Sequence, residues 1–328
     1  MNGAKEKPGI AIRCDGNRQI GGGHLMRCVS IAEALTKKGA QVRFYFADEE
    51  SRYFFHREDF ETIVLHTDYR HPEEETELLA GELSARGADA VLIDSYYASD
   101  AYLRRLRSAI SAAFEGRGAS SAAGPVRLCI LDDFCTEGRP ADLIINYLKP
   151  GRQQYVPLRG QFAGVRMPHR SHAEKLFLSS GASDPHDMKR ILTERITADF
   201  PQLTVMIPEG ITDMAAYMAS CDLAVTAGGT TVYELCAVGV PAVMYTMADN
   251  QQSLAEGVRE AVRLAGDIRD EKERAVVTER VLAWIGEMLG DEAARREQAA
   301  RETSLTDGRG AERIADEILS GIFSERAG

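Results

Sequence analysis

The chain has 328 residues, enough for two domains of ordinary size, and 44% of them are hydrophobic, so sizeable cores are expected. Its 39 Lys and Arg residues are outnumbered by 50 Asp and Glu residues, which gives a net charge of −11. This acidic balance argues against nucleic acid or an anionic membrane surface as the main partner, but a phosphorylated small molecule can still be held locally by backbone amides.

The cysteines and the N-terminus indicate the cellular compartment in which the protein is expected. The six cysteines are scattered, and no CxxC pair or Cys/His cluster suggests zinc, so we interpret them as reduced thiols. No apolar segment typical of a signal peptide begins the chain, and no run of 18 apolar residues follows. We therefore expect a soluble, cytoplasmic protein without membrane insertion. Separately, we expect a monomer that needs no metal or other cofactor.

A glycine-rich stretch follows the first predicted strand, at residues 10–15. It reads Gln19-Ile20-Gly21-Gly22-Gly23-His24 and leads into a predicted helix that ends at Gly39. Glycines there allow close approach of a ligand, and the amides of a helix start favour an anion. His24 adds a group that can move a proton near neutral pH. The alternative is that these glycines serve only tight packing and that His24 is a surface residue.

Strands and helices alternate through the rest of the first half, which predicts a parallel, doubly wound sheet. The expected strands are 42–46, 63–65, 90–94, 126–131 and 143–146, the expected helices are 73–83 and 102–114, and 115–125 is an expected loop. Ligands bind at the carboxyl ends of such strands. The polar candidates at that edge are His24, Asp94 to Tyr97, Asp132-Asp133 and Asn146. The alternative for each aspartate is helix capping, and two adjacent carboxylates are weak evidence for a metal.

A second α/β pattern begins after residues 155–172, which we interpret as a linker. It comprises expected strands at 175–179 and 203–207, a helix at 186–200 and a helix capped by Thr212. The tail is predicted to form helices at 271–301 and 311–323.

The stretch from Cys221 to Leu235 reads as a strand, a glycine turn and a helix. Gly228 and Gly229 expose backbone amides, and Thr230 and Thr231 bring hydroxyls to the helix start, which suits a diphosphate. Glu234 lies one turn into the helix and could accept hydrogen bonds from ribose hydroxyls; the alternative is an ordinary exposed helix acid. A strand at 242–245 and Asp249-Asn250-Gln251-Gln252 follow.

Together these motifs resemble the GT-B superfamily and, more closely, the UDP-2,4-diacetamido-2,4,6-trideoxy-β-L-altropyranose hydrolase family of pseudaminic acid biosynthesis, with its related spore-coat polysaccharide proteins. The resemblance is carried by 13–15, 20–28, 93–96, 131–133, 155–162, 181–185, 227–235, 250–251 and 307–311. Two departures stand out: Ala182 replaces a usual glycine, and the segment 184–212 is short by one strand and helix.

The resemblance implies a GT-B-like α/β fold with two Rossmann-like domains, 1–168 and 169–328, and a cleft between them. The first would hold the catalytic histidine and the sugar, and the second UDP. In GT-B proteins the last helix commonly crosses back to the first domain, which we expect here; the alternative is an ordinary closing helix on the second domain.

The implied reaction is attack of water on the anomeric carbon of a UDP-2,4-diacetamido-2,4,6-trideoxy sugar, with inversion and without a metal. His24 would be the base, and Tyr96 and Asn250 would line the same pocket. The remaining expected substrate contacts are Arg13, Asp15, Gly22, Gly23, Gly181, Gly228, Gly229, Thr230, Thr231, Glu234 and Gln251. Arg13 and Asp15 are equally candidates for supporting the glycine turn. Because a helix start disfavours a positive charge, we expect it to help keep His24 neutral.

Two other functions remain open. A UDP-sugar glycosyltransferase of cell-surface polysaccharide assembly would use His24 to deprotonate an acceptor hydroxyl in place of water. A catalytically inactive nucleotide-sugar binding protein is the third reading, and the joint presence of His24, Tyr96 and Asn250 argues against it.

Overall fold

The chain folds into two compact units in a computed structural model, which describes residues 7–115, 126–134, 138–181 and 184–327. Unit 1 comprises Met1–Asn146 and Ala311–Gly328, and unit 2 comprises Tyr147–Gly310. The division therefore falls at residue 146 and not at the predicted residue 168. The C-terminal segment belongs to unit 1, although the residues directly before it in the chain belong to unit 2.

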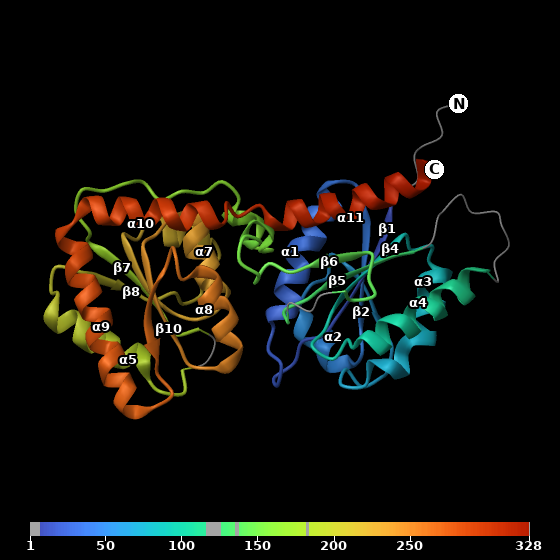
Figure 1. The fold of residues 1–328 in the computed structure, drawn as a ribbon, viewed down its shortest axis with the longest axis horizontal. Helices are drawn as coiled ribbons and strands as arrows, with labels where there is room; N and C mark the ends of the chain where they lie inside the picture. Colours follow the sequence, from blue (N-terminus) through green and yellow to red (C-terminus); the bar gives the residue numbers. More distant parts are fainter. Residues whose placement is uncertain (1–6, 116–125, 135–137, 182–183, 328) are drawn as a thin grey trace. The chain divides into compact units, whose positions relative to one another are not determined.

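Unit 1 is built on a six-stranded parallel sheet with the order β3-β2-β1-β4-β5-β6 (Figure 1). Its strands are β1 (Gly9–Cys14), β2 (Gln41–Phe46), β3 (Glu61–Val64), β4 (Ala90–Asp94), β5 (Arg127–Leu131) and β6 (Leu143–Ile145). Its helices are α1 (Gly23–Lys37), α2 (Glu49–Phe55), η1 (Pro72–Glu75), α3 (Thr76–Ala85), α4 (Asp100–Glu115) and α11 (Gly310–Ala327). The predicted doubly wound sheet is present, and the sequence analysis missed only the short helix α2.

The last helix, α11, contacts the amino end of β5 within unit 1. Arg127 Nη1 donates to the carbonyl of Glu317 at 2.6 Å and to that of Ile318 at 3.1 Å. Lys38, at the end of α1, pairs with Asp316 at 2.7 Å.

The turn after α1 depends on Gly39, whose φ of 91° lies in the left-handed region that glycine adopts readily at the end of a helix.

Unit 2 is built on a five-stranded parallel sheet with the order β11-β10-β9-β7-β8. Its strands are β7 (Lys175–Ser179), β8 (Thr204–Met206), β9 (Leu223–Ala227), β10 (Ala242–Thr246) and β11 (Arg263–Asp267). Its helices are η2 (Gln153–Tyr155), η3 (Gly160–Phe162), α5 (Met188–Asp199), α6 (Met214–Ala219), α7 (Thr230–Val238), η4 (Asp249–Gln251), α8 (Gln252–Val258), α9 (Glu271–Gly290) and α10 (Glu292–Leu305). The chain passes from β8 to α6 through one short loop.

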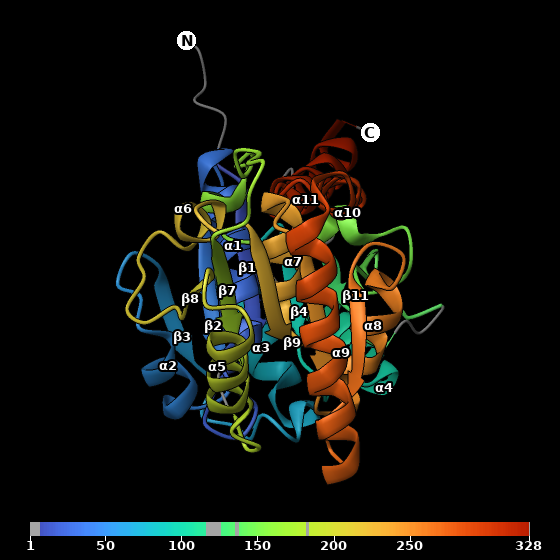
Figure 2. The same cartoon turned by 90° about the vertical axis from the view of Figure 1, so that its left-hand side faces the viewer.

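Both faces of the unit 2 sheet are covered by helices. Successive residues of β10 point to opposite faces, as in any strand. Ala242 and Met244 belong to the core beneath α6, α7 and α8, whereas Val243 and Tyr245 belong to the core beneath α5 and α9. Figure 2 shows α5 and α9 in front of the strands. This two-sided burial explains why the strands of unit 2 are nearly continuous apolar runs.

Three local expectations were wrong. Residues 155–172 are not a free linker, because Val156, Leu158 and Phe162 are buried in the core of unit 2. Helix α6 is capped by Asp213, which accepts from the amide of Ala216 at 2.9 Å, and not by Thr212. The predicted helix 271–301 is two helices, because Asp291 ends α9 and caps α10. The loop predicted at 115–125 lies almost wholly outside the described residues.

None of the described helices is both long enough and apolar enough to cross a membrane.

Candidate active site

His24 and Asp94 form a buried pair at the carboxyl edge of the unit 1 sheet. His24 is the second residue of α1, Asp94 ends β4, and they are 4% and 1% exposed. His24 Nδ1 lies 2.7 Å from Asp94 Oδ1. Because an ionised carboxylate can only accept, we assign the proton of His24 to Nδ1, which leaves the lone pair on Nε2. Arg27 Nη2 also lies 3.0 Å from Nδ1, and in this assignment it donates to Asp94 Oδ1 in place of the ring nitrogen. The surface-residue interpretation of His24 is therefore wrong.

Arg27, one turn beyond His24 on α1, contacts Asp94 and also lies directly beside His24. Its Nε donates to Asp94 Oδ2 at 2.7 Å, and its Nη1 donates to Asp133 at 2.9 Å. Burial opposes ionisation of Asp94, but the charge of Arg27 and the contact with His24 outweigh it and hold the pKa of that carboxyl well below its usual range. Asp94 is thus ionised at neutral pH and is not the helix cap considered from the sequence.

Aromatic side chains continue the site toward solvent. The rings of His24 and Tyr96 meet edge to face with centroids 4.3 Å apart, and Phe134 lies 5.8 Å from Tyr96. Tyr96 is 44% and Phe134 is 64% exposed. Partial burial, with the charge of Asp133 adding to it, raises the pKa of Tyr96, so its hydroxyl remains a hydrogen-bond donor. Exposed aromatic faces beside a buried histidine can pack against an apolar face of a ligand.

The glycine loop before α1 is held in place by Asn17. Asn17 Oδ1 accepts from the amides of Gln19 at 2.9 Å and Ile20 at 3.0 Å, and its carbonyl accepts from Gly21 at 2.8 Å. Gly21 has a φ of 73°, which requires glycine. Gly22 is the N-cap of α1 without a side-chain cap, and Gly23 begins the helix with open space at its Cβ position. A ligand can therefore approach this helix start closely.

Arg13 and Asp15 precede this loop in the chain, and their described contacts are with protein groups. Arg13 is 1% exposed and forms a bidentate salt bridge with Glu75, in which Nε donates to Oε1 at 2.8 Å and Nη2 to Oε2 at 2.7 Å. Arg13 also contacts Asp15. Asp15 Oδ1 also accepts from the amide of Ala47 at 2.8 Å. Tyr102 donates to Glu75 at 2.8 Å. Both side chains thus have buried protein partners, which argues against direct contact with sugar, and support of the glycine turn stays a prediction.

Asp132, the remaining aspartate predicted at the carboxyl edge of the sheet, is paired with Arg139. Asp132 is 2% exposed and accepts from Arg139 Nη1 at 3.2 Å. Asn146 lies just beyond β6. Among the residues that the structure describes, no group of three or more His, Cys, Asp or Glu side chains is arranged to hold a metal.

In unit 2, the predicted diphosphate turn lies between β9 and α7, but its three amides are not equivalent. The amide of Gly228 donates to the carbonyl of Tyr245 at 2.8 Å, so this amide is already paired, and a contact of Gly228 with the ligand stays a prediction that cannot rest on it. Gly229 is the N-cap of α7, has no side-chain cap and has open space at its Cβ position. The candidate anion donors are therefore the amides of Gly229, Thr230 and Thr231, at the positive end of α7.

Glu234, one turn into α7, is not an ordinary exposed helix acid. Its side chain is 13% exposed and accepts from Arg159 Nη2 at 2.8 Å. Burial raises the pKa of this carboxyl, and Arg159 opposes the shift. Glu234 is thus a mostly buried acceptor beside the turn that is paired with Arg159, and its contact with ribose stays a prediction.

The other expected contacts of unit 2 follow neighbouring strands. Gln251 Oε1 accepts from the amide of Met247 at 2.8 Å, and a Cβ on Gly228 would lie 3.1 Å from Gln251. Gly181 follows β7 with a φ of 82°. Asn250 lies in η4, and its side chain is outside the described part, as is Ala182. His24 and Tyr96 therefore belong to unit 1, and Asn250 to unit 2.

Sequence reasoning included Asp94 and Asp133 only among general edge candidates, and it gave Arg27 no role. The available signal was the spacing of three residues between His24 and Arg27, which places both on one face of a helix.

Comparisons with known proteins agree with this architecture. Residues 154–308 match the family model of the glycosyltransferase family 28 C-terminal domain. The spore coat polysaccharide biosynthesis protein SpsG of Bacillus subtilis (strain 168) is 22% identical over 285 residues, which covers 75% of this chain and 80% of SpsG.

Among solved structures, MurG of Acinetobacter baumannii matches with a TM-score of 0.69 at 15% identity, covering 95% of this chain and 99% of MurG. The glycotransferase of kitacinnamycin matches with a TM-score of 0.59 at 17% identity, covering 97% and 100%. A UDP-N-acetylglucosamine 2-epimerase matches with a TM-score of 0.56 at 13% identity, covering 98% and 97%. The chain therefore has a GT-B-like α/β fold with two Rossmann-like domains.

Proposed function

We propose that this protein is a UDP-sugar glycosyltransferase of cell-surface polysaccharide assembly, with His24 as the general base. The observation that carries the proposal is the 2.7 Å contact between His24 Nδ1 and Asp94, which leaves Nε2 as the acceptor of a proton. Unit 2 supplies the match to the glycosyltransferase family 28 C-terminal domain. The name of SpsG supports a role in polysaccharide biosynthesis, and the fold shared with the glycotransferase of kitacinnamycin supports glycosyl transfer.

The proposed step is a single displacement at the anomeric carbon of the donor. His24 Nε2 takes the proton of an acceptor hydroxyl while the oxygen of that hydroxyl bonds to the anomeric carbon. The bond from that carbon to the diphosphate oxygen breaks, and UDP leaves with the electron pair. Asp94 stabilises the imidazolium that forms, and Tyr96 and Phe134 offer aromatic faces to the sugar.

The diphosphate would be held in unit 2 by the amides of Gly229, Thr230 and Thr231, with Glu234 accepting from a ribose hydroxyl. Asn250 and Gln251 remain proposed contacts on the segment after β10, and Gly181 on the turn after β7. The backbone donors and the helix start provide positive charge without a metal.

A second candidate is hydrolysis of a UDP-2,4-diacetamido-2,4,6-trideoxy sugar, as in the resembled pseudaminic acid family. The observation that favours it is the burial of the base, since His24 is only 4% exposed and water reaches such a site more easily than a bulky acceptor does. The same dyad would then deprotonate water, and the product would be the free sugar.

Release of UDP separates these functions. Purified protein is given the UDP-diacetamido-trideoxy sugar, or UDP-N-acetylglucosamine, in EDTA, with and without a panel of carbohydrate acceptors. UDP release that requires an acceptor supports the transferase, and rapid release without one supports the hydrolase. UDP binding without turnover under either condition contradicts both and indicates a binding protein.

Two controls complete this experiment. His24→Ala should abolish turnover and retain UDP binding, because His24 and the glycine turn belong to different units. Turnover should persist in EDTA. Loss of activity that magnesium restores would overturn the metal-independent mechanism.

A further inference from the structure

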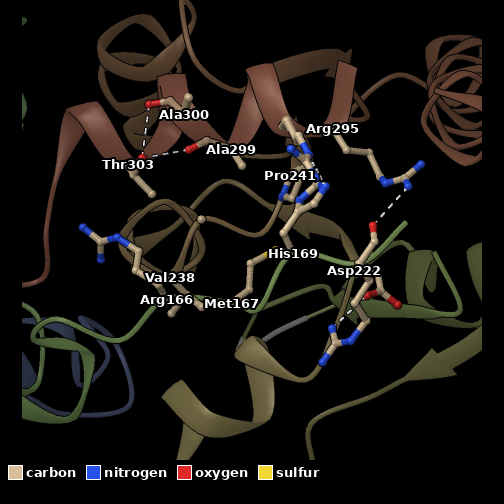
Figure 3. Close-up of a pocket in the computed structure, with 13 residues that line it drawn as sticks. Arg166, Met167, His169, Asp222, Val238, Pro241, Arg295, Ala299, Ala300 and Thr303 are labelled. Carbon is tan, nitrogen blue, oxygen red and sulfur yellow. Dashed lines mark hydrogen bonds and ion pairs between the residues drawn. The ribbon is translucent and has the colours of Figure 1, made fainter. Parts of the chain in front are cut away.

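A pocket lies in unit 2, away from the glycine turn. It has a volume of about 230 Å³ and lies between the segment before β7, the end of α7 and helix α10 (Figure 3). Its wall includes Arg166, Arg170, Arg295 and Arg296. Four guanidinium groups around one hollow are unexpected in a chain with a net charge of −11.

The acidic groups beside this pocket do not balance its arginines. Arg170 pairs with Asp222 at 2.8 Å, and Arg296 pairs with Glu292 at 2.9 Å. The contacts of Arg166 and Arg295 in the described structure are with main-chain carbonyls. Two guanidinium charges are therefore left without a carboxylate, and a bound anion would neutralise them.

Helix capping explains part of this cluster but not all of it. Arg295 is 4% exposed and donates to the carbonyls of Leu289 and Ser171, so it ties the end of α9 to the segment before β7. Arg166 makes one such contact at the end of α7 through Nη1. Arg166 and Arg296 are exposed, and both line the pocket. Arg166 has no carboxylate partner among its described contacts and can bind a ligand from solvent. Arg296 would bind the same ligand beside Glu292 and His169, with which it is already in contact.

The pocket is distinct from the proposed nucleotide site. Asp222 and Pro241 directly precede β9 and β10, so the pocket lies at the amino ends of the strands. Gly228 and Gly229 follow the carboxyl end of β9. A strand of five residues separates the two ends by about 16 Å. One small ligand cannot occupy both places.

The apolar lining and the small volume of the pocket limit the class of ligand that it can bind. Met167, Val238 and Pro241 are apolar and line it together with Ala299 and Ala300. A volume of about 230 Å³ is below the range of about 300–1,000 Å³ typical of sites for whole drug-sized ligands. It therefore suits a headgroup with a short apolar stem. Bidentate guanidinium donors recognise phosphoryl oxygens well.

We propose that this pocket binds a phosphoryl group carried on an apolar body, at a site separate from the nucleotide turn. The proposal does not depend on the proposed catalytic function. The same chemistry occurs in small soluble phosphate esters and in lipid headgroups, and the test below separates the two sources.

Binding is measured by isothermal titration calorimetry on the full chain, with phenyl phosphate as the probe. We expect binding that persists in saturating UDP and weakens by about tenfold or more in the double variant Arg166→Gln/Arg296→Gln. The double variant Arg190→Gln/Arg301→Gln removes the same charge from exposed arginines of α5 and α10 outside the pocket, and it should bind as the parent does.

Three results would overturn the proposal: no binding of phenyl phosphate at millimolar concentration, equal weakening in the two double variants, or displacement by UDP. The variant Arg166→Lys/Arg296→Lys retains the charge and should recover part of the affinity. Buried Trp284, the single tryptophan of the chain, donates to Gln298 on α10, so its fluorescence checks that this region remains folded.

Sedimentation with vesicles that contain phosphatidic acid identifies the source. If the wild-type protein sediments with the vesicles and the Arg166→Gln/Arg296→Gln variant does not, the phosphoryl group is that of a lipid. Absence of retention together with phenyl phosphate binding assigns it to a soluble ester. Retention without any phenyl phosphate binding contradicts a phosphoryl pocket.

Discussion

His24 and Asp94 are separated by 70 positions in the chain, and His24 Nδ1 lies 2.7 Å from Asp94 Oδ1 at the edge of one sheet. The contact exists because α1 begins after β1, and β1 pairs with β4 so that Cys14 lies beside Asp94. A parallel sheet thereby brings a histidine at a helix start to a carboxylate at a strand end.

Replacing Asp94 by Asn should lower kcat by about 10²–10⁴-fold, because the neutral amide no longer fixes the tautomer of His24 or stabilises its charged form. UDP affinity should be unchanged. Asp133→Asn is the matched control, since Asp133 contacts Arg27 and has no contact with His24 among those described. Steady-state UDP release, with a thermal melt to confirm folding, provides the measurement. Equal losses in both variants would refute the dyad.

Gly229→Ala should weaken UDP binding by about tenfold while the melting temperature stays unchanged. Its backbone is extended and the Cβ position is open, so only an approaching phosphate would meet the new methyl. Gly228→Ala should instead destabilise the fold, because its Cβ would meet Gln251 at 3.1 Å and Met244 at 3.2 Å. Titration with UDP and thermal melts test the pair. Unchanged UDP affinity in Gly229→Ala would place the diphosphate elsewhere.

Arg13→Met should destabilise unit 1 by about 3–5 kcal/mol, because Glu75 and Asp15 would remain buried without their cation. Arg195→Met removes an exposed arginine that pairs with Glu279 and should leave the unfolding midpoint nearly unchanged. Urea unfolding followed by circular dichroism measures both. A mild effect at Arg13 would mean that water replaces the guanidinium and that the loop support is dispensable.

Glu302→Gln should stabilise the protein increasingly as pH rises. Burial raises the pKa of Glu302 from 4.5 to about 8, so the folded state holds a proton that the unfolded state releases. Wild-type stability from this group is fully present below about pH 4.5 and is lost as pH rises through 8. Glutamine keeps the contacts with Ala242 and Gln298 without ionising.

The difference in unfolding free energy between this variant and wild type should grow from about 1 kcal/mol at pH 5 to several kcal/mol near pH 8 and then level off, at about 1.4 kcal/mol per pKa unit. Urea unfolding from pH 5 to pH 9 measures it. Glu297→Gln, on the exposed side of the same helix, is the control. A difference that does not change with pH would contradict a protonated Glu302.

Local sequence patterns determined most of the secondary structure. Alternating apolar strands and helices predicted both parallel sheets, and Gly39 ended α1 as its position indicated. The patterns failed where a single capping side chain sets the start of a helix. Asp213 caps α6, and Asp291 divides the helix predicted at 271–301 into two. Residues 155–172 lacked periodicity because they pack as irregular chain, with Phe162 buried in the core.

The sequence by itself also identified His24 and the glycine turn at 228–229, since glycines and titratable groups at strand ends carry a local signal. Only the tertiary structure decided their chemistry. It paired His24 with Asp94, placed Arg27 beside them, directed the amide of Gly228 to Tyr245 and set Arg13 against Glu75. Each partner is chosen by sheet order and register, which bring distant strand ends together and which no local spacing encodes.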